Sequence, residues 1–386
     1  ITFDAERGCI TSLIDKKSGR EWIDPKAEQG FGQYLNERFT YEQTLDYTMT
    51  YQQGRAKDWA HPGICKPGME SEKEVSYRAA SPQQGVLKMT AEGDVQIDEL
   101  AMPSDRSNHL PASVLRISLY KDQPYVDMEI TRQDKAKDNW PEADWLCLPF
   151  RIEQPEFNVY RQLGVMNPAT DIQSGANRHL YAAEYGVTIT GRDGAGMAVC
   201  PLDHPLISLG VPGCWKYSDD YVPEQPVVYL NLYNNQWNTN FRYWYPGTWS
   251  SRVRIWTIEE GTTPEERSQL FVTSALEARN PLQAVSVKKN EGNLPAAQSG
   301  IEVSRAGVTV TAFGADPDGN TGTLLRVWEQ VGVSGKLMVT LPKGMNASLA
   351  VPVNLRGEKK GDPIHIKSGK FELELGAYAP ASFILE

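Results

Sequence analysis

The sequence predicts an all-β fold in which a large β domain is followed by a smaller β-sandwich. Short runs of alternating apolar and polar residues recur from about residue 74 to the C-terminus, separated by clusters of Pro, Gly, Asp and Asn. This spacing is typical of antiparallel sheets. A single helical signature near residue 263 interrupts the runs, and a chain of 386 residues is too long for one ordinary core. Together these observations predict two β domains joined by a helix.

The large domain is assigned to residues 1–260. Residues 1–22 have the pattern of a strand, a turn and a second strand, with glycines at the turn positions. Residues from about 25 to 68 are polar and aromatic and show little periodicity, so we expect loops that cover a sheet. The strand runs that follow from residue 74 complete the domain.

The helical signature begins with Thr263 as the N-cap, Pro264 at the first helical position and acidic residues in the first turn. Asn280 and Pro281 end it. We therefore expect residues 261–284 to form a helical connector. Residues 285–386 carry their own set of strand runs, and about a hundred residues of this kind make one small β-sandwich.

Composition and charge limit the partners. Apolar residues make up 40% and charged residues 23% of the chain, as in ordinary globular proteins, and no run approaches the roughly 18 apolar residues of a membrane span. A net charge of −10 argues against nucleic acid or an anionic membrane as a partner, because both require a basic surface. The charge is compatible with a neutral ligand such as a sugar.

The cysteines and the first residue give two further expectations. The five cysteines are scattered and form no CxxC motif, so neither a disulfide framework nor a zinc knuckle is expected. The sequence begins with Ile1 inside a predicted strand, and we expect a further N-terminal segment before it.

Residues 227–256 are the first candidate for a ligand site. Two predicted strands enclose a run of asparagines and aromatic residues, and five of the ten tryptophans lie between positions 215 and 256. Primary amides suit vicinal hydroxyls, and flat aromatic rings suit the C–H face of a sugar. The alternative is a buried aromatic hairpin in which asparagines are turn residues. The concentration of large rings favours a binding surface, with Asn235, Trp237 and Asn240 as candidate contacts.

A second candidate lies between two predicted strands, where Asp203 and His204 stand between prolines. A carboxylate next to an imidazole can contact a hydroxylated ligand. The alternative, which we favour, is a plain turn between strands.

Two more candidates come from other parts of the chain. Trp140 and Glu142 belong to a short loop with two indoles and three carboxylates, and glycoside hydrolysis uses paired carboxylates, so Glu142 or Asp144 is a conceivable acid. Capping of the sandwich is an equally good interpretation. Arg326 alternates with apolar residues in a predicted strand, which suits either a surface ion pair or a contact with the ligand loop of the large domain.

Common catalytic motifs are missing. The sequence has no phosphate-binding loop, no dinucleotide-binding glycine pattern, no GxSxG elbow, and no HxH or HxxxH pair. We therefore assign no catalytic residue, no metal ligand and no cofactor to this chain.

Several segments carry a resemblance to a known family. FDAERGCITSLIDKKSGREW, DNWPEADWLCLPF, PLDHPLISLG and NNQWNTNF resemble the C-terminal region of glycoside hydrolase family 38, the α-mannosidases. TLLRVWEQVGVSGKLMVTLP resembles the last β-domain of that family. The segments span nearly the whole chain in the order of the family. The resemblance implies a galactose-mutarotase-like β-supersandwich followed by a terminal β-sandwich.

The resemblance also implies a function for the intact enzyme. It would remove α-linked mannose with retention, through a glycosyl-enzyme intermediate on an aspartate, with one zinc ion held by histidines and aspartates. In the family these residues belong to an N-terminal catalytic region, and no segment here matches that region. We therefore expect zinc only in a missing catalytic domain, and we expect that domain and a mannoside-type glycan as partners.

On this interpretation the chain is inactive alone, and its loops complete the sugar pocket. The residues expected to support that pocket are Asn235, Trp237, Asn240, Asp203 and Arg326. Two alternatives stay open: a stand-alone carbohydrate-binding module, and a sugar isomerase or lyase on the same fold with His204 as the base.

Overall fold

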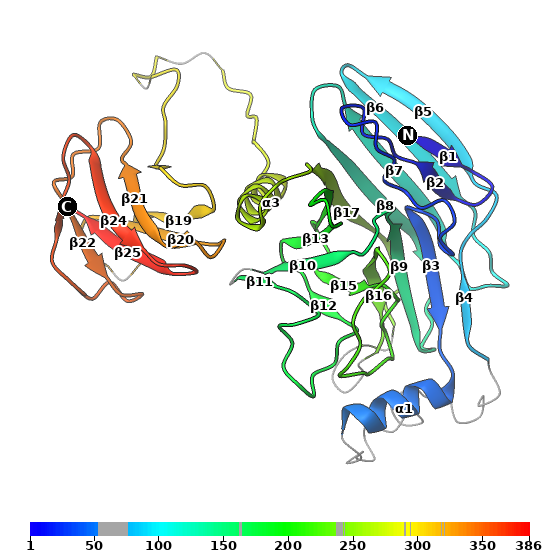
Figure 1. Cartoon of the computed structure of the whole chain (residues 1–386). Coiled ribbons are helices and arrows are strands. Elements are labelled where there is room, and N and C mark those ends of the chain that lie inside the picture. Colours follow the sequence, from blue (N-terminus) through cyan, green and yellow to red (C-terminus); the bar gives the residue numbers. More distant parts are fainter. Residues whose placement is uncertain are drawn as a thin grey trace. The chain divides into compact units, whose positions relative to one another are not determined.

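The computed structural model describes residues 1–52, 76–161, 164–236, 242, 244–288, 291–293, 295–317, 319 and 321–386. The chain divides into two compact units. The first unit comprises Ile1–Arg161 and Met166–Thr262, and the second comprises Gln162–Val165 and Thr263–Glu386. Antiparallel sheets dominate both units (Figure 1), which confirms the all-β prediction.

A nine-stranded antiparallel sheet, in which every strand except the edge strand Gly164–Met166 lies wholly in the first unit, forms one layer of that unit. Its strands are, in spatial order, β11 (Gly164–Met166), β10 (Glu156–Arg161), β13 (Gly186–Thr190), β14 (Gly196–Pro201), β17 (Gly247–Ile258), β8 (Tyr125–Lys135), β7 (Ala112–Tyr120), β6 (Val95–Met102) and β5 (Val86–Glu92).

A six-stranded sheet forms the other layer. Apolar residues of both sheets, among them Met128 and Ile130 of β8 and Leu146 and Leu148 of β9, share one core cluster. The two layers therefore form a sandwich. The strands of the second sheet are, in spatial order, β12 (Tyr181–Ala182), β15 (Leu206–Leu209), β16 (Val227–Asn234), β9 (Glu142–Pro149), β3 (Gln33–Arg38) and β4 (Arg78–Ala80), and the small N-terminal hairpin is β1 (Thr2–Asp4) with β2 (Cys9–Ser12).

Strand β9 is buried along its whole length, because both of its faces are covered. Leu146 and Leu148 point into the core between the sheets, while Trp145 and Cys147 pack on the opposite face in a second aromatic cluster. Side chains two residues apart in a strand lie on the same face. Glu142 and Asp144, at the start of β9, are separated from Leu146 by four and two residues. Their side chains therefore lie on the same inward face of the strand as Leu146.

Helix α1 (Tyr41–Tyr51) corrects the expectation of loops between residues 25 and 68. Strand β3 also lies in this part of the chain. Thr40 caps the helix: its hydroxyl oxygen accepts from the Gln43 amide at 3.1 Å, and the Gln43 side-chain oxygen accepts from the Thr40 amide at 2.9 Å. The buried residues of α1 are Tyr41, Thr44 and Tyr47, and Leu45 is the one aliphatic residue that packs beside them, which hides the helical period in the sequence.

Helix α3 (Pro264–Arg279) confirms the predicted helical signature. Thr263 is its N-cap and forms a reciprocal capping box with Glu266. The helix belongs to the second unit. No helix in the described ranges is both long enough and apolar enough to cross a membrane.

The second unit is a small β-sandwich, as predicted. Its core contains Leu325, Val327, Leu337, Phe371 and Phe383, which come from both sheets. The three-stranded sheet comprises β18 (Glu302–Val303), β21 (Gly335–Thr340) and β24 (Lys370–Leu375), and the five-stranded sheet comprises β19 (Val308–Ala315), β20 (Thr323–Glu329), β25 (Pro380–Leu385), β22 (Leu349–Val353) and β23 (Ile364–His365).

The close approach of β13 and β14 gives a first testable prediction. A Cβ added to Gly196 would lie 2.0 Å from the carbonyl oxygen of Ile189, so the backbone of β13 would have to move. We expect Gly196→Ala to destabilise the first unit by about 1–3 kcal/mol in urea unfolding. Gly314→Ala is the control, because a Cβ there meets nothing within 4 Å. Equal unfolding midpoints for the two variants would contradict the prediction.

Candidate functional site

Charged and polar side chains occupy one end of the core between the two sheets. Strands β3 and β9 place Asn36 opposite Asp144 and Arg38 opposite Glu142. From the nine-stranded sheet, Arg132 and Lys135 of β8 reach these carboxylates. We call this group the polar cluster: Asn36, Arg38, Arg132, Lys135, Glu142 and Asp144.

Every carboxylate of the polar cluster is paired. Arg132 forms an ion pair with Asp144, and Lys135 forms one with Glu142. Asn36 Nδ2 also donates to Asp144 Oδ1 at 2.7 Å. Arg132 is 2% exposed and Asp144 is fully buried. Buried charges persist only when they are paired and hydrogen-bonded. Burial also lowers the pKa of the Arg132 guanidinium.

Aromatic rings from the 227–256 stretch cover the cations of the polar cluster. The Arg132 guanidinium carbon lies 5.0 Å from the centroid of the Tyr233 ring and 4.5 Å from that of Trp249. Lys135 Nζ lies 4.9 Å from the Tyr233 centroid. These distances are typical of cation–π contacts. Part of the aromatic content that suggested a binding surface therefore packs against buried charge.

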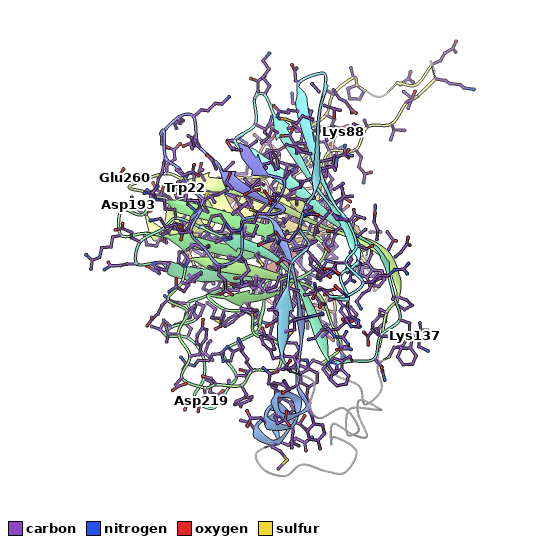
Figure 2. The ribbon with its side chains drawn as sticks, turned by 90° about the vertical axis from the view of Figure 1, so that its right-hand side faces the viewer. Trp22, Lys88, Lys137, Asp193, Asp219 and Glu260 are labelled. Carbon is purple, nitrogen blue, oxygen red and sulfur yellow. The ribbon has the colours of Figure 1, made fainter. Side chains whose placement is uncertain are left out.

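A more exposed pair lies next to the polar cluster. Lys137 follows β8, and its Nζ lies 3.9 Å from the centroid of the Trp244 ring. Figure 2 labels Lys137 on the side of the molecule where this end of β8 lies. Tyr245, which is 42% exposed, contacts Tyr233 edge to face at a centroid distance of 6.4 Å. Aromatic residues thus continue from the polar cluster to the surface.

Three of the sequence-predicted site residues are brought together here. Asn235 Oδ1 accepts from the backbone amide of Glu142 at 2.9 Å, and Asn235 Nδ2 donates to the carbonyl of Trp140 at 2.7 Å. All three side chains are buried. They join the end of β16 to the start of β9. Trp237 and Asn240, the other predicted contacts in this segment, lie outside the described residues.

Asp203 and His204 lie in the connection between β14 and β15. The Asp203 carboxylate accepts from Arg252 Nε at 3.0 Å and Nη2 at 2.8 Å, and these hydrogen bonds lower the pKa of Asp203. Burial lowers the pKa of His204, and the nearby Arg132 charge adds to this effect while Asp203 opposes it. The His204 imidazole is therefore neutral at pH 7.

Arg326 lies in the second unit, on β20. Its Nε donates to Ser382 Oγ of the neighbouring strand β25 at 2.9 Å. This is a cross-strand contact within one sheet. The contact of Arg326 with the ligand loop of the large domain stays a prediction.

The sequence analysis missed Arg132 and Lys135. Arg132 continues the alternation of Met128 and Ile130 on β8, so it occupies an inward position. Glu142 continues the inward alternation of β9 in the same way. A cation thus follows the apolar alternation of β8, and an anion precedes that of β9. This pattern is the sequence signal that could have predicted the polar cluster.

Glu37 lies on the opposite face of β3 and is fully buried. Its carboxyl oxygens accept from Trp145 Nε1 and from the Tyr77 hydroxyl, each at 2.7 Å. Burial nevertheless raises the pKa of Glu37 above its ordinary value of 4.5. Below pH 4.5 the group is protonated in both the folded and the unfolded chain. Above pH 4.5 the unfolded chain ionises first, so stability falls as pH rises through the raised folded pKa.

We therefore expect Glu37→Gln to flatten the pH dependence of stability above pH 4.5. In the unaltered chain this group lowers the free energy of unfolding by up to about 1.4 kcal/mol per pH unit within the window. Urea unfolding of both proteins across this pH range measures the difference. Parallel curves would show that Glu37 does not titrate in this window.

Metal ligands do not cluster in the part of the chain that the structure describes. No group of three or more His, Cys, Asp or Glu side chains there is placed to hold a metal ion. The residues in the described ranges thus do not form a zinc site.

Comparisons with known proteins bear on the fold. No family model matches the chain, and no curated protein matches it. The structure of an α-mannosidase from Enterococcus faecalis V583 superposes with a TM-score of 0.62 at 10% identity, over 97% of this chain and 40% of that one. A protein in glycosyl hydrolase family 38 from Enterococcus faecalis gives a TM-score of 0.63 at 10% identity, over 99% of this chain and 42% of that one.

A galactose mutarotase-like protein from Lactobacillus casei ATCC 334 gives a TM-score of 0.33 at 8% identity, over 66% of this chain and 95% of that one. The chain spans about two fifths of the length of the two Enterococcus structures. At 10% identity the similarity to the two Enterococcus structures shows the fold alone. This shared fold confirms the resemblance that the sequence segments indicated. The chain has, over nearly its whole length, the fold of part of these α-mannosidase and glycosyl hydrolase family 38 structures.

Proposed function

We propose that this chain is the β-region of a retaining, α-mannosidase-like glycoside hydrolase, and that a further N-terminal domain carries its nucleophile, its acid and its zinc ion. The observation that carries the proposal is the match of 97% and 99% of the chain to about two fifths of the two Enterococcus structures. The partners of the chain are then that domain and a mannoside-type glycan.

The state of the carboxylates in the polar cluster supports the proposal. A retaining glycosidase needs two carboxyl groups about 5–5.5 Å apart that reach the scissile bond from opposite sides. Glu142 and Asp144 instead lie buried between the two sheets, where Lys135 and Arg132 neutralise their charges. Their geometry suits the support of a loop better than proton transfer to a glycan.

In this proposal the polar cluster positions the segment that faces the sugar. Asn235 ties the start of this segment to Glu142 and Trp140 through two hydrogen bonds. The segment itself is rich in asparagine and aromatic residues, and Tyr245 near its end is exposed. Amides pair with vicinal hydroxyls and aromatic faces cover apolar C–H faces, as a neutral mannoside requires.

Hydrolysis of an aryl α-mannoside in the presence of zinc tests the proposal. We expect no turnover above the buffer rate by this chain and robust turnover by a longer version of the protein that includes the upstream coding region. Robust turnover by this chain alone would overturn the proposal. An inactive longer protein together with mannoside binding by this chain would favour the stand-alone binding module.

The positioning role of Asn235 is tested in the longer protein. We expect Asn235→Ala to raise KM roughly tenfold with a smaller change in kcat, because the segment loses its anchor while the reacting groups stay in place. Asn158→Ala is the matched control, since the amide of that residue donates an exposed local hydrogen bond to Glu156 at 3.3 Å. An unchanged KM for Asn235→Ala in a folded protein would remove Asn235 from this role.

One observation favours a second candidate, a sugar isomerase. The neutral His204 has a buried Nδ1 that has no hydrogen-bond partner among the described residues, so it is available as a base. Anomer interconversion of common hexoses, followed by NMR with and without this chain, tests the idea. Acceleration that His204→Ala abolishes would support it, and the absence of acceleration would remove it.

A further inference from the structure

Two arginines stand opposite each other at the edge of the six-stranded sheet. Arg78 belongs to the edge strand β4 and lies directly opposite Arg38 of β3 in the strand register (Figure 1). Side chains in such positions have Cβ atoms about 4.5–5.5 Å apart, and like charges there repel each other. Burial lowers the pKa of the Arg78 guanidinium, and the charge of Arg38 lowers it further. We call Arg38 and Arg78 the arginine pair.

The Arg78 guanidinium has only neutral hydrogen-bond partners among the described residues. Its Nη1 donates to the carbonyl of Ser107 at 3.4 Å and to Asn108 Oδ1 at 3.2 Å. Its Nε and Nη2 are buried and have no hydrogen-bond partner in the part of the chain that the structure describes. A water molecule would satisfy these donors, but it would not supply the negative charge that a desolvated cation requires.

The carboxylates around Arg78 are engaged with other groups. Asp138 accepts from Arg38 Nη1 at 2.6 Å, and Glu142 is already paired with a lysine of β8. Asp105 accepts four hydrogen bonds from amides and side chains of its own loop. The charges of Asp105 and Glu142 raise the pKa of Arg78, but burial and the charge of Arg38 outweigh them. None of these three carboxylates therefore serves as a direct counter-ion of Arg78.

The two buried nitrogens of Arg78 form the edge of a guanidinium that suits two oxygens of one anionic group. Two other arginines of the first unit use this edge. Arg252 donates from Nε and Nη2 to Asp203 at 3.0 and 2.8 Å, and Arg254 donates from the same atoms to Asp127 at 2.6 and 2.8 Å. In Arg78 the same edge is buried, and no described residue accepts from it. The comparison indicates the ligand chemistry: a planar or tetrahedral group with at least two anionic oxygens.

The arginine pair lies close to the surface. Arg78 is half-buried, and the His109 side chain is 50% exposed. His109 Nδ1 lies 3.6 Å from Asp138 Oδ2, the atom that also accepts from Arg38. His109 follows Asn108, whose side chain holds Arg78 Nη1. The loop between β6 and β7 thus borders the arginine pair, and a small ion can approach the pair along the exposed imidazole.

We propose that the arginine pair binds an oxoanion, that is a carboxylate, sulfate or phosphate group, which is either a free ion or part of an acidic sugar. Two oxygens of the group accept from Arg78 Nε and Nη2, and its charge offsets the repulsion between Arg78 and Arg38. The site goes beyond the proposed function, which concerns a neutral mannoside. It does not depend on that function, because it needs no catalytic domain.

Titration calorimetry on the chain as it stands, with sodium chloride holding the ionic strength constant, tests the site. The probes are sulfate, inorganic phosphate, D-mannose 6-phosphate and D-glucuronate. We expect sulfate and phosphate to bind at a single site with a Kd in the millimolar range. A lower Kd for either sugar acid than for the free ions would identify an acidic sugar as the source of the oxoanion.

Two substitutions of Arg78 locate the binding. Arg78→Gln should raise the Kd of sulfate roughly tenfold or more, because the charge and the paired donors are lost. Arg78→Lys keeps the charge but loses the two-pronged geometry, so it should raise the Kd severalfold. The lysine variant also keeps the test decisive if Arg78→Gln does not fold.

Arg106→Gln is the matched control, since it removes the same charge from an exposed residue of the loop between β6 and β7, and it should leave the Kd unchanged. Non-specific attraction of anions is weak for a chain with a net charge of −10. Absence of sulfate and phosphate binding would overturn the proposal. So would binding that both Arg78 variants leave unchanged, or that Arg106→Gln weakens equally. The mannoside turnover assay uses the longer protein and a neutral substrate, so failure of one proposal is distinguishable from failure of the other.

Discussion

Asp144→Ala is expected to destabilise the first unit by about 3–5 kcal/mol. The substitution leaves the Arg132 guanidinium between the sheets without its counter-ion, and that side chain is only 2% exposed. Asn36 also loses the acceptor of its 2.7 Å hydrogen bond. Removing one partner of a buried ion pair costs far more than the pair contributes, because the remaining charge stays desolvated.

Urea unfolding followed by tryptophan fluorescence measures this effect. Among the tryptophans that the structure describes, Trp328 alone lies outside the first unit, so most of the signal reports on that unit. Asp203→Ala is the control: it breaks the ion pair with Arg252, whose side chain is 59% exposed, and should cost about 1 kcal/mol or less. If both substitutions lowered the free energy of unfolding by the same small amount, the polar cluster would not be a desolvated network.

Trp145→Ala is expected to cost about 3–5 kcal/mol as well, through loss of packing. Trp145 is fully buried and packs edge to face on Tyr229 with ring centroids 6.1 Å apart. Its Nε1 donates to Glu37 at 2.7 Å, so the truncation also removes a hydrogen bond from a buried carboxyl group. The cavity and the lost donor act in the same direction.

Far-UV circular dichroism in urea measures this variant, because the substitution changes the fluorescence signal itself. Trp328→Ala is the matched control, since it removes an indole from the second unit and should leave the transition of the first unit in place. A loss below about 1 kcal/mol for Trp145→Ala would show that the aromatic layer repacks around the missing ring.

The strand pattern was the most predictable part of the fold. Runs of β-branched, aromatic and aliphatic residues located the strands at the two ends of the 227–256 stretch, now β16 and β17, and proline with a capping threonine located α3. Helix α1 was not predicted, because its buried residues are two tyrosines and a threonine, which also suit a strand or a loop. Its capping box at Thr40 and Gln43 was present in the sequence as a start signal.

The candidate site was predictable only in part. The hydrogen bonds of Asn235 join residues more than ninety positions apart, and no local pattern encodes such a pairing. The sequence pointed to Glu142 but not to Lys135 or Arg132, because a charge in a strand normally marks the solvent face. Only the face-to-face packing of the two sheets shows that these charges neutralise one another.

We propose that the carboxylates of this chain support a sugar-facing segment and do not cleave the glycan themselves. The most direct measurement is the initial rate of aryl α-mannoside hydrolysis by the chain alone, unaltered and as Glu142→Gln and Asp144→Asn, with zinc present. We expect all three proteins to show only the buffer rate. Hydrolysis by the unaltered chain that either substitution abolishes in a folded protein would contradict it.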